Sequence, residues 1–227
     1  MKNSLQATLA SSLVVVCFSV VNPVHAQHSQ HDAKAAPASA TVLQTGAALR
    51  DLWMGHVFWV RNVVLETGAG NTAAATAAEQ EVVANAKQIS AAIEPYYGKA
   101  ASDKLFGLLA GHYGAVKQYL EATNANSKPG QDSAMKNLTG NAGDIAVFLS
   151  SANPNLPLET LRGLLLAHGS HHVQQIQQLH DKQYAQEAKT WAEMKNHMYV
   201  IADAMAAALV KQFPAKFSQA VAAQLPG

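Results

Sequence analysis

The feature that most constrains this chain is a histidine motif that recurs at a fixed interval. The pattern Leu-x-x-Leu-x-x-x-His occurs three times, 56 residues apart, and ends at His56, His112 and His168. The same shift aligns other positions without a gap, among them Asn85 with Asn141. We therefore expect an internal 56-residue repeat that contains three related helices.

Apolar residues follow helical spacing along most of the chain, and no stretch combines strand alternation with hairpin turns. Aromatic residues make up only 7% of the sequence and alanine is abundant, which favours closely packed helices over a β-sandwich. Breaks rich in Gly, Pro and Asn, including Pro95 to Gly98, separate the helical stretches, and Ser102 and Asp132 are candidate N-caps. The expected fold class is all-α, a bundle of four long helices plus two shorter ones. The expected helices lie near residues 43–67, 75–95, 101–125, 130–150, 158–182 and 185–212.

Residues 1–26 have the pattern of a secretory signal peptide. Lys2 precedes an apolar run from Leu9 to Val21, and small residues lead up to an expected cleavage site after Ala26. The run is shorter than the ~20 residues that a membrane span needs, so we expect export to the periplasm or secretion, with no span after cleavage. The expected segments are the signal peptide at 1–26, a disordered tether at 27–42, a helical-bundle domain at 43–213 and a C-terminal tail at 214–227.

Charge and cysteine content exclude several classes of function. The net charge of +1 over 227 residues gives neither the basic footprint of a nucleic-acid binder nor a polybasic membrane patch. The single cysteine, Cys17, lies in the expected signal peptide. Cleavage would therefore leave no thiol, which excludes disulfides, thiolate catalysis, iron–sulfur clusters and covalent c-type haem. The expected partner is a metal ion or a small ligand.

The spacing of the histidines predicts that they face the interior of the bundle. Residues at positions i, i+3 and i+7 share one helical face, so each repeated histidine lies on an apolar stripe with its two leucines. His172 follows His168 by one turn, and the last helix carries a similar stripe that includes His197. Glu193, one turn before His197, can add an oxygen ligand. The candidate metal ligands are His56, His112, His168, His172, His197 and Glu193.

Neutral imidazoles that converge in a dry interior form a site for Cu, Zn or Ni. The pair His168-x-x-x-His172 is a helix chelate of the kind that such sites use. Two alternatives remain open: a structural or interaction module whose histidines only order the core, and, with less support, a bundle that binds b-type haem. An enzyme has the least support, because no partner carboxylate or nucleophile lies at usable spacing. We therefore expect a binding protein without catalytic turnover.

Three strings resemble a family of uncharacterised bacterial exported helical-bundle proteins: LWMGHVFWVRNVV, NAGDIAVFLSSANPNLP and ADAMAAALVKQFP. The resemblance covers most of residues 43–214 and implies a helical bundle without implying an established activity. The positions that match the family's pattern are Leu52, Trp53, His56, Val57, Trp59, Arg61, His112, His168 and the closing Val210 to Pro214.

Overall fold

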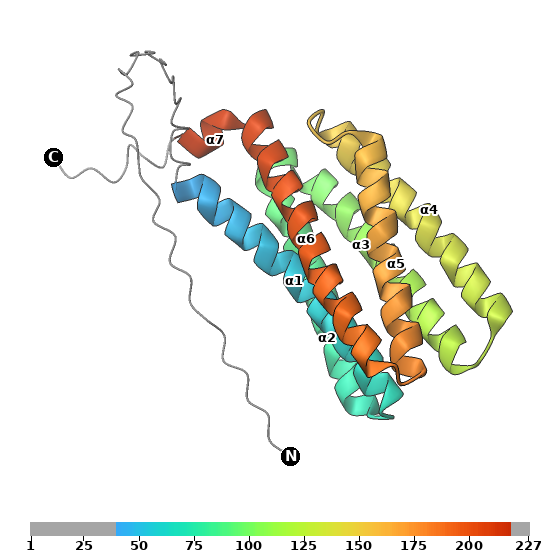
Figure 1. Ribbon diagram of the computed structural model, residues 1–227. Coiled ribbons are helices and arrows are strands. Elements are labelled where there is room, and N and C mark those ends of the chain that lie inside the picture. Colours follow the sequence, from blue (N-terminus) through green and yellow to red (C-terminus); the bar gives the residue numbers. More distant parts are fainter. Residues whose placement is uncertain (1–39, 219–227) are drawn as a thin grey trace, which may run out of the picture. The chain divides into compact units, whose positions relative to one another are not determined.

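The computed structural model describes residues 40–218, which fold as helices joined by short turns, without a strand in this part of the chain. The expected all-α fold class is therefore confirmed (Figure 1). The helices are α1 (Ala40–Gly68), α2 (Thr72–Tyr97), α3 (Lys99–Asn124), α4 (Lys128–Ala152), α5 (Leu158–His180), α6 (Tyr184–Gln212) and α7 (Pro214–Ser218).

All six expected helices are present, and their lengths are similar. They span 23 to 29 residues, so a division into four long and two shorter helices is not observed. Helix α1 begins at Ala40, inside the expected tether at 27–42, and α7 forms the first five residues of the expected tail. The expected signal peptide at 1–26, the tether up to residue 39 and the tail after Ser218 lie outside the described residues.

Three expected helix ends differ in the structure. Pro95 does not end α2, which continues to the residue before Gly98. Gly98 has a φ of 81°, a left-handed conformation that glycine adopts without a steric penalty, and it separates α2 from α3. Ser102 and Asp132 lie inside helices rather than at their N-caps. Ser127 caps α4 instead, because its hydroxyl accepts a hydrogen bond of 3.2 Å from a backbone N–H of the first turn.

The helices pack in a closed ring. Each of α1 to α6 packs against its neighbours in sequence, and α6 returns to α1 (Figure 1). Helices α1, α3 and α5 also contact one another inside the ring, while α2, α4 and α6 each bridge two of these three. The helices that carry the repeated histidines are therefore the three that meet in the interior.

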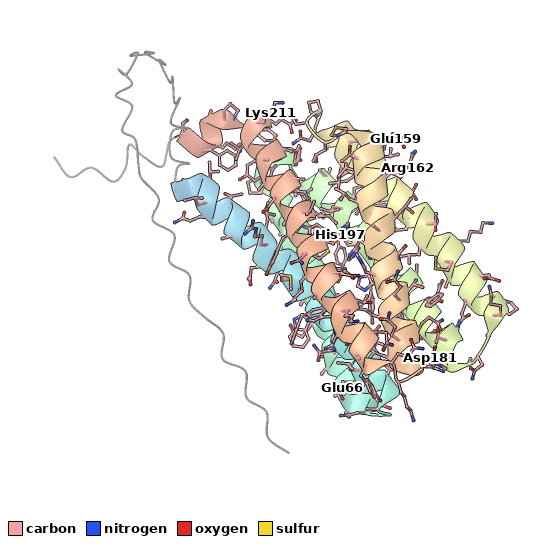
Figure 2. All side chains as sticks on the ribbon, viewed as in Figure 1. Glu66, Glu159, Arg162, Asp181, His197 and Lys211 are labelled. Carbon is pink, nitrogen blue, oxygen red and sulfur yellow. The ribbon has the colours of Figure 1, made fainter. Side chains whose placement is uncertain are left out.

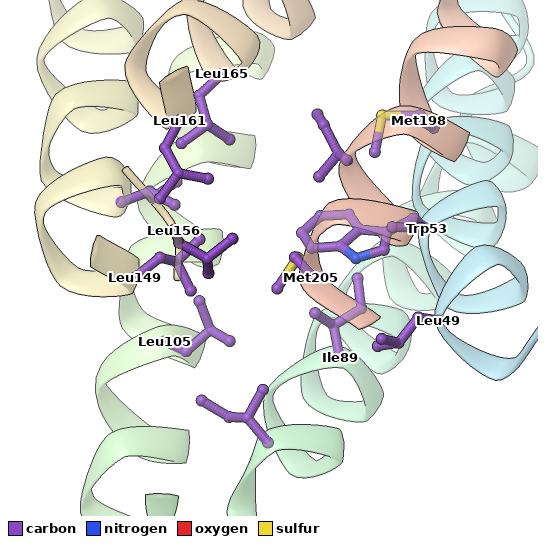
Figure 3. Close-up of a cluster of buried hydrophobic side chains, with 14 of the residues drawn as sticks. Leu49, Trp53, Ile89, Leu105, Leu149, Leu156, Leu161, Leu165, Met198 and Met205 are labelled. Carbon is purple, nitrogen blue, oxygen red and sulfur yellow. The ribbon is translucent and has the colours of Figure 1, made fainter. Parts of the chain in front are cut away.

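Two apolar clusters fill the bundle. The buried His56, His112, His168 and His172 lie near the boundary of these clusters on the inner helices α1, α3 and α5, at a level that we call the histidine layer. On α1, His56 lies beside Val57, the last residue of the first cluster on this helix, and the second cluster begins at Val60. On α3, the first cluster ends at Leu109 and the second begins at Tyr113. Figure 3 shows side chains of the first cluster, which come from all six long helices and converge on one interior. The histidine layer is thus closed by apolar packing at both ends.

None of the helices within residues 40–218 combines the length and the apolar character that crossing a membrane requires.

Candidate metal centre

Four histidines from three different helices meet in the histidine layer. His56 comes from α1, His112 from α3, and both His168 and His172 from α5. Each side chain is only 3–4% exposed. One potential ligand nitrogen from each ring lies within 4.8 Å of the corresponding nitrogens of the other three rings. We call these four residues the histidine cluster.

The rings of the histidine cluster are close enough to share one ion. The ring centroids of His56 lie 5.9, 5.6 and 5.7 Å from those of His112, His168 and His172. The centroids of His112 and His168 are 5.2 Å apart. The Nε2 atoms of His168 and His172 are 3.2 Å apart, a distance at which the two rings can share a hydrogen bond when one of these nitrogens carries a proton. Because metal–nitrogen bonds of ~2.0–2.1 Å place tetrahedral ligands about 3.4 Å from each other, this pair already has the separation of two bound ligands.

Several ring nitrogens of the cluster have no hydrogen-bond partner. Both nitrogens of His112, Nε2 of His56 and Nδ1 of His168 are buried and have no hydrogen-bond partner among residues 40–218. Buried polar atoms normally form hydrogen bonds, because leaving one unpaired costs ~1–3 kcal/mol. An ion at the centre of the cluster would accept lone pairs from several of these nitrogens and so give them the partner that the protein does not supply.

Burial keeps all four rings neutral, the form in which imidazole binds metals. It lowers the pKa of His56 to about 3, with the nearby His112 adding to the effect. It lowers the pKa of His112 to about 4, while the Asn141 side chain opposes the shift. The pKa values of His168 and His172 fall well below the ordinary value, again through burial first and then through neighbouring histidines.

Two asparagines lie directly behind the cluster, and sequence reasoning assigned them no role. Asn85 Nδ2 donates to the Leu52 carbonyl on α1, and Asn141 Nδ2 donates to the Leu108 carbonyl on α3, each at 3.0 Å across 33 residues. The side-chain oxygens of both asparagines are buried without a partner. Asn141 raises the pKa of His112, as an acceptor near the ring does, although no hydrogen bond of normal geometry joins the two.

Glycines one residue before His56 and His112 make room for these asparagines. A Cβ at Gly55 would lie 2.9 Å from Asn85 Nδ2, and a Cβ at Gly111 would lie 3.0 Å from Asn141 Nδ2. Any larger residue would push the amide away from the helix that carries the histidine. The shared 56-residue spacing of the glycines and the asparagines was a signal that could have identified them.

His197 and Glu193 lie outside the histidine cluster. His197 is half-buried on the face of α6 that approaches α5 (Figure 2), and its Nε2 donates to the Leu164 carbonyl at 2.8 Å. This bond spans 33 residues, like those of the two asparagines. In the helix pair α5 and α6, His197 therefore takes the place that Asn85 has in α1 and α2 and that Asn141 has in α3 and α4. Its ring also contacts His171, at 5.3 Å between centroids. Glu193 is exposed.

A small apolar cavity of about 70 Å³ borders the cluster at His56. Its other walls come from α2 and α3, among them Ile89, Phe106 and Leu109, and it reaches the surface near Val83. A second polar group, at the buried carboxylate of Glu187, links α1 to α6: Arg61 Nε and Nη2 donate to its two oxygens at 2.6 and 2.7 Å. This acid is therefore already neutralised by a cation.

In comparisons with protein-family models, with curated proteins and with solved structures, nothing matches the chain. The resemblance to the bacterial helical-bundle family stays a sequence-based prediction, and the function has to be argued from the site.

Proposed function

We propose that this chain is an exported, non-enzymatic protein that binds one transition-metal ion through His56, His112, His168 and His172. The observation that carries the proposal is the convergence of four buried imidazoles whose ligand atoms lie within 4.8 Å of one another. Imidazole suits copper, zinc and nickel, the ions that the sequence alone indicates.

The alternative, in which the histidines only order the core, accounts for His168 and His172, which can hydrogen-bond to each other through their Nε2 atoms, but not for His112. A buried structural histidine normally bonds to a carbonyl, a carboxylate or a water. His197 does so through the Leu164 carbonyl, but neither nitrogen of His112 bonds to a protein atom in the described part of the chain. A core that needed only packing would lose nothing by placing apolar residues here, as the chain does at Val57 and Val60.

Haem and catalysis have less support than a bare ion. The cavity that adjoins the cluster measures about 70 Å³, whereas pockets for organic ligands occupy roughly 300–1,000 Å³. A porphyrin would therefore have to displace packed helices. Catalysis through one of these histidines would be helped by a partner carboxylate or nucleophile, and the group that converges here consists of histidines alone.

Export is supported by the sequence of residues 1–26, with a short positive start, an apolar run, and the tolerated Val24 and small Ala26 at the −3 and −1 positions of the expected cleavage site. Cys17 is the only cysteine and lies in this segment, so a processed chain would reach an oxidising compartment without a thiol.

The experiment is metal analysis of the untagged protein, followed by thermal unfolding with and without added Cu, Zn or Ni. We expect one ion per chain and a higher melting temperature in its presence, because a ligand that binds only the folded state stabilises it. The variants His56→Ala and His112→Ala should lose both effects. His180→Ala is the matched control, since His180 lies at the end of α5 and pairs with Asp181. If none of the three metals changes the melting temperature of the wild-type protein, a structural module whose histidines only order the core would explain the cluster better than a metal site.

A further inference from the structure

The charge of the candidate metal centre restricts which ion it can hold. All four members of the histidine cluster are neutral ligands, and no acid belongs to the group. Among the described residues, Glu187 is the one buried acid, and Arg61 binds both of its oxygens. Glu193, the acid expected to contribute an oxygen ligand, is exposed. An ion in the cluster would therefore keep its full positive charge.

Full charge is costly in this position because the cluster is buried. Its side chains are 3–4% exposed, and apolar clusters close the histidine layer at both ends. The free energy of moving an ion out of water grows with the square of its charge, so an uncompensated divalent ion pays about four times the penalty of a monovalent one. Divalent sites usually reduce this penalty with carboxylate or thiolate ligands, and this centre supplies neither.

We infer that the histidine cluster holds copper as Cu(I), in preference to a divalent ion. This inference rests on the proposed function and names the ion for the same site. Among the transition-metal ions that imidazole suits, Cu(I) carries a single charge. It also binds with two, three or four ligands, which fits a cluster with one close pair, the 3.2 Å pair His168 and His172, and two further rings.

The test is a competition titration under anaerobic conditions with the full-length, untagged protein. Cu(I) is titrated against a chromogenic Cu(I) chelator, and Zn(II) and Ni(II) are each titrated separately against a chromogenic chelator of that ion. We expect one Cu(I) per chain, bound about 100-fold or more tightly than Zn(II).

Two variants at one position separate charge from geometry. His172→Asp adds a carboxylate to the cluster and should move the ratio of Cu(I) to Zn(II) affinities at least about tenfold towards Zn(II). His172→Val introduces the residue that stands 56 and 112 residues earlier, at Val116 and Val60, both buried. It should keep Cu(I), which three imidazoles satisfy, and weaken Zn(II) more strongly. His180→Asp, on the same helix outside the cluster, should leave the ratio unchanged.

The outcomes separate the two proposals. If wild-type protein binds Zn(II) or Ni(II) as tightly as Cu(I), the inference is overturned and the proposed function stands. If it binds none of the three ions, both fail. If His172→Asp does not fold, the His172→Val variant decides, and equal losses of Cu(I) and Zn(II) affinity there would count against Cu(I) selectivity.

Discussion

At the scale of single residues, the candidate centre depends on side chains that need not touch an ion. Asn141 anchors its amide nitrogen on the Leu108 carbonyl and leaves its oxygen buried near His112. Residues that accept the second N–H of a metal-bound histidine fix its tautomer and orientation. We therefore expect Asn141 to orient His112, and Asn85, with the same anchoring bond on α1, to do so for His56.

Asn141→Ala should weaken metal binding by roughly 10–100-fold, the usual effect of losing such a residue. The matched control is Asn137→Ala, one turn earlier on α4, because Asn137 is exposed and bonds only to Gln118. Titration calorimetry of both variants checks this. Equal affinities in the two variants would show that Asn141 does not position the ring.

The glycines before the histidines give a second residue-scale prediction. Gly55→Ala should destabilise the protein by about 1–3 kcal/mol, because the new Cβ would lie 2.9 Å from Asn85 Nδ2 in a packed interior. Gly107→Ala is the control, since a Cβ there meets nothing within 4 Å and alanine favours the helix by up to ~1 kcal/mol. Urea denaturation measures both. A stabilised Gly55→Ala variant would contradict the close approach.

Sequence spacing placed the repeated histidines correctly, because an inward face follows directly from positions i, i+3 and i+7. It did not separate His197 from the cluster. Met194, Met198 and Ile201 define the buried face of α6, and His197 stands at its edge, where it reaches a backbone carbonyl instead. Whether an inward ring meets an ion or a carbonyl depends on the neighbouring helix, and the residue spacing within one helix carries no information about that neighbour.

At the scale of helices, the buried ion pair between Arg61 and Glu187 holds α1 to α6. Burial would raise the pKa of Glu187, but the two hydrogen bonds and the positive charge of Arg61 lower it overall. Gln175 on α5 adds a third hydrogen bond to the acid, at 3.1 Å. Three helices therefore meet at one carboxylate.

Arg61→Ala should cost about 2–4 kcal/mol of stability, because it leaves a buried carboxylate without its cation. Arg50→Ala removes a pair of similar geometry between the same two helices, Arg50 with Asp203, but both side chains are about half exposed, so the loss should be clearly smaller than for Arg61→Ala. Chemical denaturation of the two variants compares them. Similar losses would mean that burial does not set the value of this pair.

Helix positions were predictable from sequence to within a few residues, while some of their ends were not. Pro95 was expected to stop α2, but a proline disrupts mainly what precedes it, and here the helix persists to the residue before Gly98. Ser127 rather than Asp132 caps α4, since the serine directly precedes the first turn and Pro129 fits that turn. The residue type identifies the candidates for an N-cap, and the position at which the packed helix begins decides which of them forms the cap.

At the scale of the whole molecule, the neutral histidine layer makes the stability of the metal-free protein depend on pH. The pKa is about 3 for His56 and about 4 for His112 in the folded state, against an ordinary value of 6.5. Between these values the unfolded chain binds more protons, so stability falls as pH falls below 6.5. We expect a loss of a few kcal/mol between about pH 7 and about pH 4, measured by urea denaturation of metal-free protein. His172→Val should flatten the profile, and an unchanged slope in that variant would contradict the prediction.

Export gives the last prediction. Expressed in a bacterium, the full chain should appear outside the cytoplasm and begin at Gln27, because cleavage is expected after Ala26. Cell fractionation with mass spectrometry of the intact protein measures both. A variant with Ala26→Arg, which removes the small residue before the cleavage site, should accumulate unprocessed. Recovery of the complete chain from the cytoplasm would rule the export proposal out.

The all-α class was predictable because the apolar period runs almost unbroken. The closure of α6 onto α1 was not, since contacts between helices far apart in sequence leave no local signature.

The apolar packing at both ends of the histidine layer has a kinetic consequence. An ion in the cluster could leave through the apolar cavity beside His56, which reaches the surface near Val83, or when neighbouring helices separate. Its residence time would therefore depend on these motions of the protein as well as on the strength of its bonds. Such a centre would release its ion slowly from the isolated protein and faster to a partner protein that separates the helices.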